Sequence, residues 1–205
     1  MSLHWDKKIA GIILAQRERE ELYEETEELS ELAWLEMVKS GEVRFENHTI
    51  GMEKQSLFDR QLEIMLPRHL SSVPKGELGR EGTAHNRDQY LFINEQEQLS
   101  CGLLWMQRSE MEIDLEFLKD CMMIESKGKK PEIRLFELES DALKQLNIET
   151  FDSLIPIENG HVYQLVFLGM FDNRVLIGSF QFKADQATLW RPLSTAIIQT
   201  IRLNK

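Results

Sequence analysis

The sequence has few cysteines, which argues against a scaffold stapled by disulfides. Only two, Cys101 and Cys121, occur among 205 residues, one in a predicted strand and one in a predicted helix. We interpret both as small buried apolar side chains in a reducing compartment. A bridge between them remains an open alternative, although a chain of this size does not need one.

Long apolar runs are missing as well. The longest run near the N-terminus, residues 9–15, is too short to cross a bilayer. Lys7 and Lys8 precede it, as in a signal peptide, but acidic helix-like sequence follows without a small-residue cleavage site. We therefore expect a cytoplasmic protein that does not contact membranes.

Basic residues are outnumbered by acidic ones. The chain holds 24 Lys and Arg against 35 Asp and Glu, which gives a formal net charge of −11. Binding to nucleic acid depends on clustered Lys and Arg, so this balance argues against it and equally against docking on anionic lipid. The acidic excess is concentrated in residues 18–31, which hold eight Glu and one Arg.

The first forty residues have the pattern of a helix. Residues 6–40 contain no proline and one glycine, and apolar residues recur there in three- and four-residue steps. This pattern predicts one long helix, or two collinear ones, ending at Gly41 as a C-terminal cap. We treat residues 1–41 as an N-terminal helical arm and residues 42–205 as an α+β domain. The narrow apolar seam suits either a solvated helix or an arm that pairs with a second copy or a partner helix.

A β-hairpin near the C-terminus is expected to organise the domain. Residues 162–170 and 175–182 are mostly apolar at both alternating sets of positions, so both faces of these strands should be covered. Residues 172–173 can form the tight turn of an antiparallel hairpin. Gly169 and Gly178 lie inside the strands, where glycine indicates a bulge or a close neighbour rather than a ligand loop.

Shorter elements fill the rest of the chain. We expect strands over residues 42–45, 50–52, 57–67, 89–93, 99–106, 133–138 and 151–157, and helices over residues 112–127 and 141–146. A terminal helix should start near Pro192, with Trp190 as a core or rim anchor, and close over the hairpin. Its apolar face comprises Leu193, Ala196, Ile197, Thr200 and Ile201. Hairpin connections predict an antiparallel β-sheet flanked by helices, an α+β fold, and not a βαβ nucleotide fold.

No motif with a recognised chemistry is present. The glycines of residues 76–82 lack the strand-before-helix context and the Lys-Ser/Thr ending of a phosphate loop. The five histidines are far apart, and the His and carboxylate pairs in residues 85–88 and 158–161 lie in turns without further ligands. We expect no metal, no cofactor and no enzymatic activity. An enzyme whose residues come from distant loops would escape this search.

Two features of residues 57–203 carry a resemblance to a known family. Leu57-Phe58 opens a predicted strand that ends at Leu66-Pro67, and the long hairpin is followed by Trp190 and a terminal helix with Ile198 and Ile201. This stretch resembles the PsbP-like superfamily, which includes photosystem accessory proteins, a Ran-binding nuclear import factor and bacterial DcrB-type proteins. The resemblance implies a PsbP-like sandwich and a binding or assembly role. Because the members share no active site, it transfers no functional residue.

We therefore predict a non-enzymatic binding or accessory protein that acts through protein–protein contacts, or through self-association of the N-terminal helix. The predicted contact residues are Tyr23, Leu29, Trp34 and Met37 on the arm and His69, Arg80 and His85 in the irregular stretch that follows Pro67. The alternative is a small-molecule-binding or hydrolytic enzyme with its site between the sheet and residues 69–88. A deep pocket that joins His69 or His85 to a carboxylate would favour this alternative.

Overall fold

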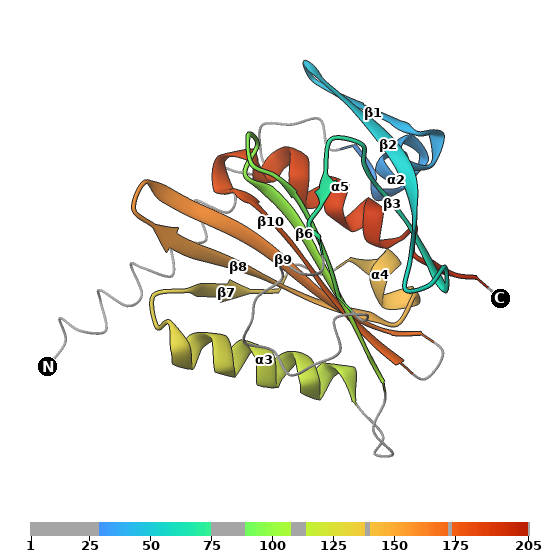
Figure 1. Ribbon diagram of the computed structural model, residues 1–205. Helices are drawn as coiled ribbons and strands as arrows, with labels where there is room; N and C mark the ends of the chain where they lie inside the picture. Colours follow the sequence, from blue (N-terminus) through green and yellow to red (C-terminus); the bar gives the residue numbers. More distant parts are fainter. Residues whose placement is uncertain (1–28, 75–88, 108–113, 138–139, 172–173, 205) are drawn as a thin grey trace, which may run out of the picture. The chain divides into compact units, whose positions relative to one another are not determined.

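The computed structural model describes residues 29–74, 89–107, 114–137, 140–171 and 174–204 (Figure 1). The chain divides into two compact units, residues 1–30 and 31–205. The second unit is an α+β fold with two antiparallel sheets, as predicted. Among the described helices, none has the length and hydropathy that a membrane span requires.

The two sheets differ in size. The smaller one contains, in spatial order, β1 (Glu42–Phe45), β2 (His48–Leu57), β3 (Leu62–Pro67) and β11 (Arg202–Leu203). The larger one contains β4 (Ser71–Ser72), β5 (Gln89–Asn94), β6 (Leu99–Gln107), β10 (Arg174–Lys183), β9 (Gly160–Phe171), β8 (Ile148–Ile157) and β7 (Arg134–Phe136). The helices are α2 (Glu31–Ser40), α3 (Leu115–Lys129), α4 (Asp141–Gln145) and α5 (Ala187–Ile198), and the 3-10 turn η2 (Ala184–Gln186) precedes α5.

Helix α5 lies between the two sheets (Figure 1). It contacts β3 of the smaller sheet, β9 and β10 of the larger sheet, and α2. Leu193, Ala196 and Ile197 of the predicted apolar face are buried, and so is Trp190, which confirms its reading as a core anchor. Thr200 and Ile201 are also buried, but they lie beyond the end of the helix at Ile198, so their prediction as helical residues is wrong. The predicted start near Pro192 is wrong, because α5 begins at Ala187 and Pro192 lies inside it. Its missing N–H costs a helical hydrogen bond, which the burial of the surrounding side chains offsets.

Helix α3 covers the opposite face of the larger sheet (Figure 1). A second apolar cluster forms there from Leu115, Phe151, Val166, Leu168 and Val175. The helix continues to Lys129, so the prediction that Gly128 ends it is wrong. Cys101 is buried as predicted, but Cys121 is exposed on α3, which corrects the prediction that both thiols are buried; both are free.

The central hairpin is confirmed. Strands β9 and β10 pair from Phe171 and Arg174 to Val162 and Lys183. Gly178 lies opposite Phe167, and a Cβ added to this glycine would overlap the phenyl ring. The ring is fully buried, so it has little room to move aside. The glycine therefore marks a close neighbour, as the sequence indicated.

The smaller sheet corrects another prediction. The prediction of a single strand over residues 57–67 is wrong. Leu57 is the last residue of β2, and β3 begins only at Leu62. Between them Phe58, Asp59 and Arg60 have φ angles of 52°, 56° and 67°, so the chain turns there. No glycine signals this turn, since side chains other than glycine seldom adopt positive φ. The short edge strand predicted over residues 50–52 is part of β2, which lies inside the sheet.

Helix α2 belongs to the α+β unit rather than to an arm. Leu29 and Ser30 are not helical, so the described residues do not support a continuous helix through this point; residues 1–28 lie outside the described part. The end at Gly41, with φ of 89°, is as predicted. Trp34 is buried and α2 contacts α5, which explains why the unit begins at Glu31 and not after Gly41.

Replacing Gly178 by Ala should destabilise the protein by about 1–3 kcal/mol, because the new methyl group meets the buried ring of Phe167. Gly128→Ala is the matched control. An added Cβ there meets nothing within 4 Å, and alanine favours the helix by about 0.5–1 kcal/mol. Urea unfolding of both variants measures the two effects. Equal stabilities would contradict the close packing at Gly178.

Candidate functional site

A pocket of about 290 Å³ lies where four separate segments of the chain meet. Its walls come from residues 45–50 at the β1–β2 turn, from His69 after β3, from Glu97 in the β5–β6 turn, and from residues 185–190 at the start of α5. The lining of the pocket therefore comes from segments next to both sheets and from the helix that lies between them. These four segments are far apart in the sequence, so no sequence motif predicts that they meet.

Local hydrogen bonds fix the loops of this pocket. In the β5–β6 turn, the side-chain oxygen of Asn94 accepts hydrogen bonds from the backbone N–H of Gln96 at 3.0 Å and of Glu97 at 3.2 Å. On the other side, the backbone N–H of Leu70 donates to the carbonyl of Pro67 at 3.1 Å and closes the turn that holds His69. Side-chain capping of this kind is a common way to order a short turn.

His69 and Glu97 form the polar centre of the pocket. His69 Nε2 lies 3.1 Å from Glu97 Oε2, and their side chains are 30% and 43% exposed. The contact has the distance of an ion pair but not the alignment of a hydrogen bond. The ring of His69 packs edge-on against Trp190, with centroids 6.0 Å apart. A half-exposed pair of this kind contributes only about 0–1 kcal/mol to stability, so a ligand can open it at little cost.

The pocket combines acidic and aromatic groups. Glu46, Glu97 and Asp185 contribute carboxylates, and Phe45 and Trp190 contribute aromatic surface. Carboxylates beside aromatic faces favour a cationic group or a hydrogen-bond donor. In the part of the chain that the structure describes, no group of three or more His, Cys, Asp or Glu side chains could hold a metal ion.

Of the predicted contact residues that the structure describes, one lines this pocket. His69 does, whereas Leu29 is exposed and Met37 is partly buried against the main core. Trp34 is buried with its ring 5.1 Å from that of Phe45, so the prediction that it contacts a partner is corrected: it supports the pocket wall from behind. The other three predicted residues, Tyr23, Arg80 and His85, lie outside the described residues.

Several pocket residues escaped the sequence analysis. Glu97 lies in a turn, His48 is the first residue of β2, and Asp185 lies in the short segment η2. Turns and the ends of elements show no helical or strand periodicity. From the sequence, a carboxylate paired with His69 from a distant part of the chain is expected to favour a small-molecule site. Glu97 is such a carboxylate.

A second hollow, more open and more apolar, lies on the face of the larger sheet beside α3. It measures about 360 Å³, and its apolar lining includes Leu91, Leu104, Ile177 and Met122. It contains no His, Asp or Glu among its described lining residues, so it has fewer ionisable groups for binding or catalysis than the pocket around His69.

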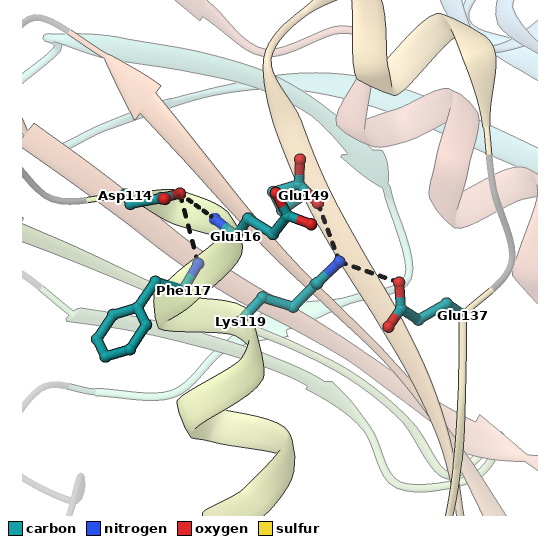
Figure 2. A network of polar contacts seen from close by, with 6 residues as sticks. All are labelled: Asp114, Glu116, Phe117, Lys119, Glu137 and Glu149. Atoms are coloured by element: carbon teal, nitrogen blue, oxygen red, sulfur yellow. Dashed lines mark hydrogen bonds and ion pairs between the residues drawn. The ribbon is translucent and has the colours of Figure 1, made fainter.

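The described residues also contain a charge cluster around the buried Lys119, which Figure 2 shows. Lys119 of α3 donates from Nζ to Glu137 at 3.0 Å and to Glu149 of β8 at 3.2 Å. One turn earlier, the side chain of Asp114 caps α3 by accepting from the backbone N–H of Glu116 at 3.0 Å and of Phe117 at 3.4 Å. These contacts fix the helix on the sheet.

The cluster around Lys119 is structural rather than catalytic. Burial by itself would lower the pKa of Lys119, but the hydrogen bonds to Glu137 and Glu149 outweigh it and raise the pKa above its ordinary value of 10.5. A lysine that acts as a base or nucleophile needs a lowered pKa. Lys119 therefore stays charged and holds α3 in place.

The described fold resembles several solved structures. Cyanobacterial PsbP (CyanoP) from Synechocystis sp. PCC 6803 superposes with a TM-score of 0.56 at 8% identity, over 79% of this chain and 98% of that chain. The Saccharomyces cerevisiae Ran-binding protein Mog1p gives 0.53 at 13% identity, over 75% and 96%. A Mog1 variant gives 0.53 at 11% identity, over the same shares.

The chain has a PsbP-like fold. This confirms the resemblance drawn from the sequence, although one of its two supports, the strand opened by Leu57-Phe58, is wrong. No protein-family model matches the sequence, and no curated protein matches it either. At identities this low the PsbP-like likeness concerns the fold, and the site has to be argued from this chain's own residues.

Replacing Lys119 by Met should destabilise the protein by about 1–3 kcal/mol at pH 7, because Glu137 and Glu149 then lose their shared cation. The pKa of Lys119 is raised in the folded state, so its contribution is complete below pH 10.5 and is lost as the pH rises through the raised pKa. Urea unfolding of wild type and variant from pH 7 to alkaline pH should show the difference shrinking. Lys129→Met, at an exposed ion pair, is the control and should change stability little.

Proposed function

We propose that this protein is a non-enzymatic binding protein that acts through protein–protein contacts, and that the pocket around His69 and Glu97 receives a side chain of the partner. The observation that carries the proposal is the half-exposed His69–Glu97 pair inside a pocket built from four segments. A binding pocket needs polar groups that can change partners, and this pair has that property.

The chemistry of the lining favours a basic side chain. A Lys or Arg side chain entering the pocket meets the carboxylates of Glu46, Glu97 and Asp185 and the faces of Phe45 and Trp190. Glu97 then exchanges its contact with His69 for a charge-assisted hydrogen bond from Lys or Arg, which is stronger than an ordinary hydrogen bond. The partner therefore presents an exposed Lys or Arg.

The fold agrees with a binding role. Mog1p, a structural neighbour of this chain, is by its name a Ran-binding protein, so this fold serves protein recognition in at least that case. We also propose a cytoplasmic location, where the free thiols of Cys101 and Cys121 remain reduced.

We keep the contact role predicted for Leu29, which is exposed, and add Leu32 of α2, which is 64% exposed. Each is proposed by itself, because exposed large apolar side chains are suited to a partner helix or to a second copy.

One observation favours a second function, a small-molecule-binding or hydrolytic enzyme. A histidine paired with a carboxylate at 3.1 Å inside a pocket is the arrangement that positions a general base. In this reading His69 takes a proton from a substrate or a water molecule, and Glu97 orients the ring.

A probe peptide with a single Arg should shift the NMR signals of the His69 ring, while the ring of His161, in the strand β9, should not move. Because one side chain supplies the binding energy, binding should be weak, with a dissociation constant on the order of 1 mM. Glu97→Gln should weaken binding about 5–10-fold through loss of the charge, whereas Glu132→Gln, an exposed residue outside the pocket, should not.

A matching peptide with Glu in place of Arg is the second control and should leave both rings unchanged. If the Arg peptide shifts His69 no more than His161, or if Glu97→Gln leaves its affinity intact, the pocket is not the contact site. Hydrolysis of p-nitrophenyl acetate that is lost in His69→Asn would instead establish the enzymatic alternative.

A further inference from the structure

Helix α3 carries an exposed apolar stripe on the side that faces away from the sheet. Phe117 is 67% exposed, Ile124 is 72% exposed, and Cys121 lies between them and is exposed as well. Steps of four and three residues place these three side chains on one face of the helix. Leu115 and Lys119 are buried on the sheet side. The stripe is thus a surface that the helix does not need for its own packing.

The charges along α3 make this surface complementary to itself. Its N-terminal half carries Asp114, Glu116 and Asp120, and its C-terminal end carries Lys127, Lys129 and Lys130. The one acidic group near that end, Glu125, is paired with Lys129 at 2.6 Å. A helix with an acidic half and a basic half attracts an antiparallel copy of itself, and the antiparallel helix dipoles add to the attraction.

We infer that α3 docks antiparallel against α3 of a second copy of this chain, about a two-fold axis that passes between Asp120 and Cys121. These two residues are midway between Phe117 and Ile124. The axis therefore brings Phe117 of each copy onto Ile124 of the other, as an isologous interface requires. The same operation places Asp114 of each copy level with Lys127 of the other.

The arrangement has two unfavourable contacts. The two Asp120 side chains approach each other beside the axis, and like charges at close range repel. Glu116 of each copy also faces Glu125 of the other, but Glu125 is paired with Lys129, which reduces this second repulsion. Helix α3 has 15 residues, about 22 Å in length, so the helix pair is smaller than a standard protein interface. The dimer is therefore weak, and its population depends on protein concentration.

The test uses the full chain and two measurements. Sedimentation equilibrium over about 1–300 μM should show reversible dimerisation with a dissociation constant on the order of 10–100 μM. A short bismaleimide cross-linker should join the two copies through Cys121, and Cys121→Ser should abolish the product. Cys101 does not compete, because it is fully buried and burial raises the pKa of its thiol.

Variants then locate the interface. Phe117→Ser and Ile124→Ser should each raise the dissociation constant about 10-fold, while Asp120→Asn should lower it several-fold by removing the repulsion. Leu146→Ser is the matched control, because this leucine is 44% exposed beside α4 and away from the stripe. Its dissociation constant should equal that of wild type.

Three results would each overturn the inference. The chain could remain monomeric throughout the concentration range. The dimer could persist unchanged in both Phe117→Ser and Ile124→Ser. It could also survive those variants but dissociate in Leu29→Ser/Leu32→Ser, which would assign self-association to the segment leading into α2. None of these results affects the outcome of the peptide titration of His69, so the two proposals are tested independently.

Discussion

The structure depends on a helix whose C-terminal half is buried away from water. Every residue of α5 from Leu193 to Ile198 is buried, because the two sheets and α2 surround it. Each large apolar side chain enclosed in this way contributes about 1.5–3 kcal/mol relative to exposure. Two hydroxyl groups of the region have partners: Thr195 donates to the carbonyl of Arg191 at 3.1 Å, and Thr200 accepts from the backbone N–H of Met65 at 3.0 Å. These two hydroxyl groups are therefore satisfied within the core.

Four ion pairs at three sites show how burial separates a structural role from a binding role. Lys119 and its two glutamates are held by hydrogen bonds, with the lysine itself buried. Arg191 of α5 lies 3.5 Å from Asp152 of β8, with the carboxylate fully buried, so this pair ties the central helix to the larger sheet. Removing one partner from such pairs is costly. The His69–Glu97 pair is instead half exposed, and only this one can exchange its partner for a ligand at little cost.

Periodicity predicted the parts of the fold that repeat a pattern. The central hairpin, the hairpin of β5 and β6 and the inner face of α5 follow from apolar alternation and turn residues. The reverse turn at Phe58 could not be predicted, because its positive φ values occur without glycine. The place of α2 was missed because its burial depends on α5, which lies far along the chain. The pocket was largely invisible for the same reason: His69 could be named, but Glu97 joins it only through the fold.

The strand at the edge of the smaller sheet constrains the order in which this unit can fold. Strand β11 pairs with β3, and Asn204 donates to Glu63 across 141 positions of the sequence. Closing so long a loop has an entropic cost that must be met before the contact forms. The smaller sheet therefore gains its last strand only after α5 has docked, since α5 directly precedes that strand. The two sheets are for this reason expected to form and melt in a single cooperative step, although no strand passes from one into the other.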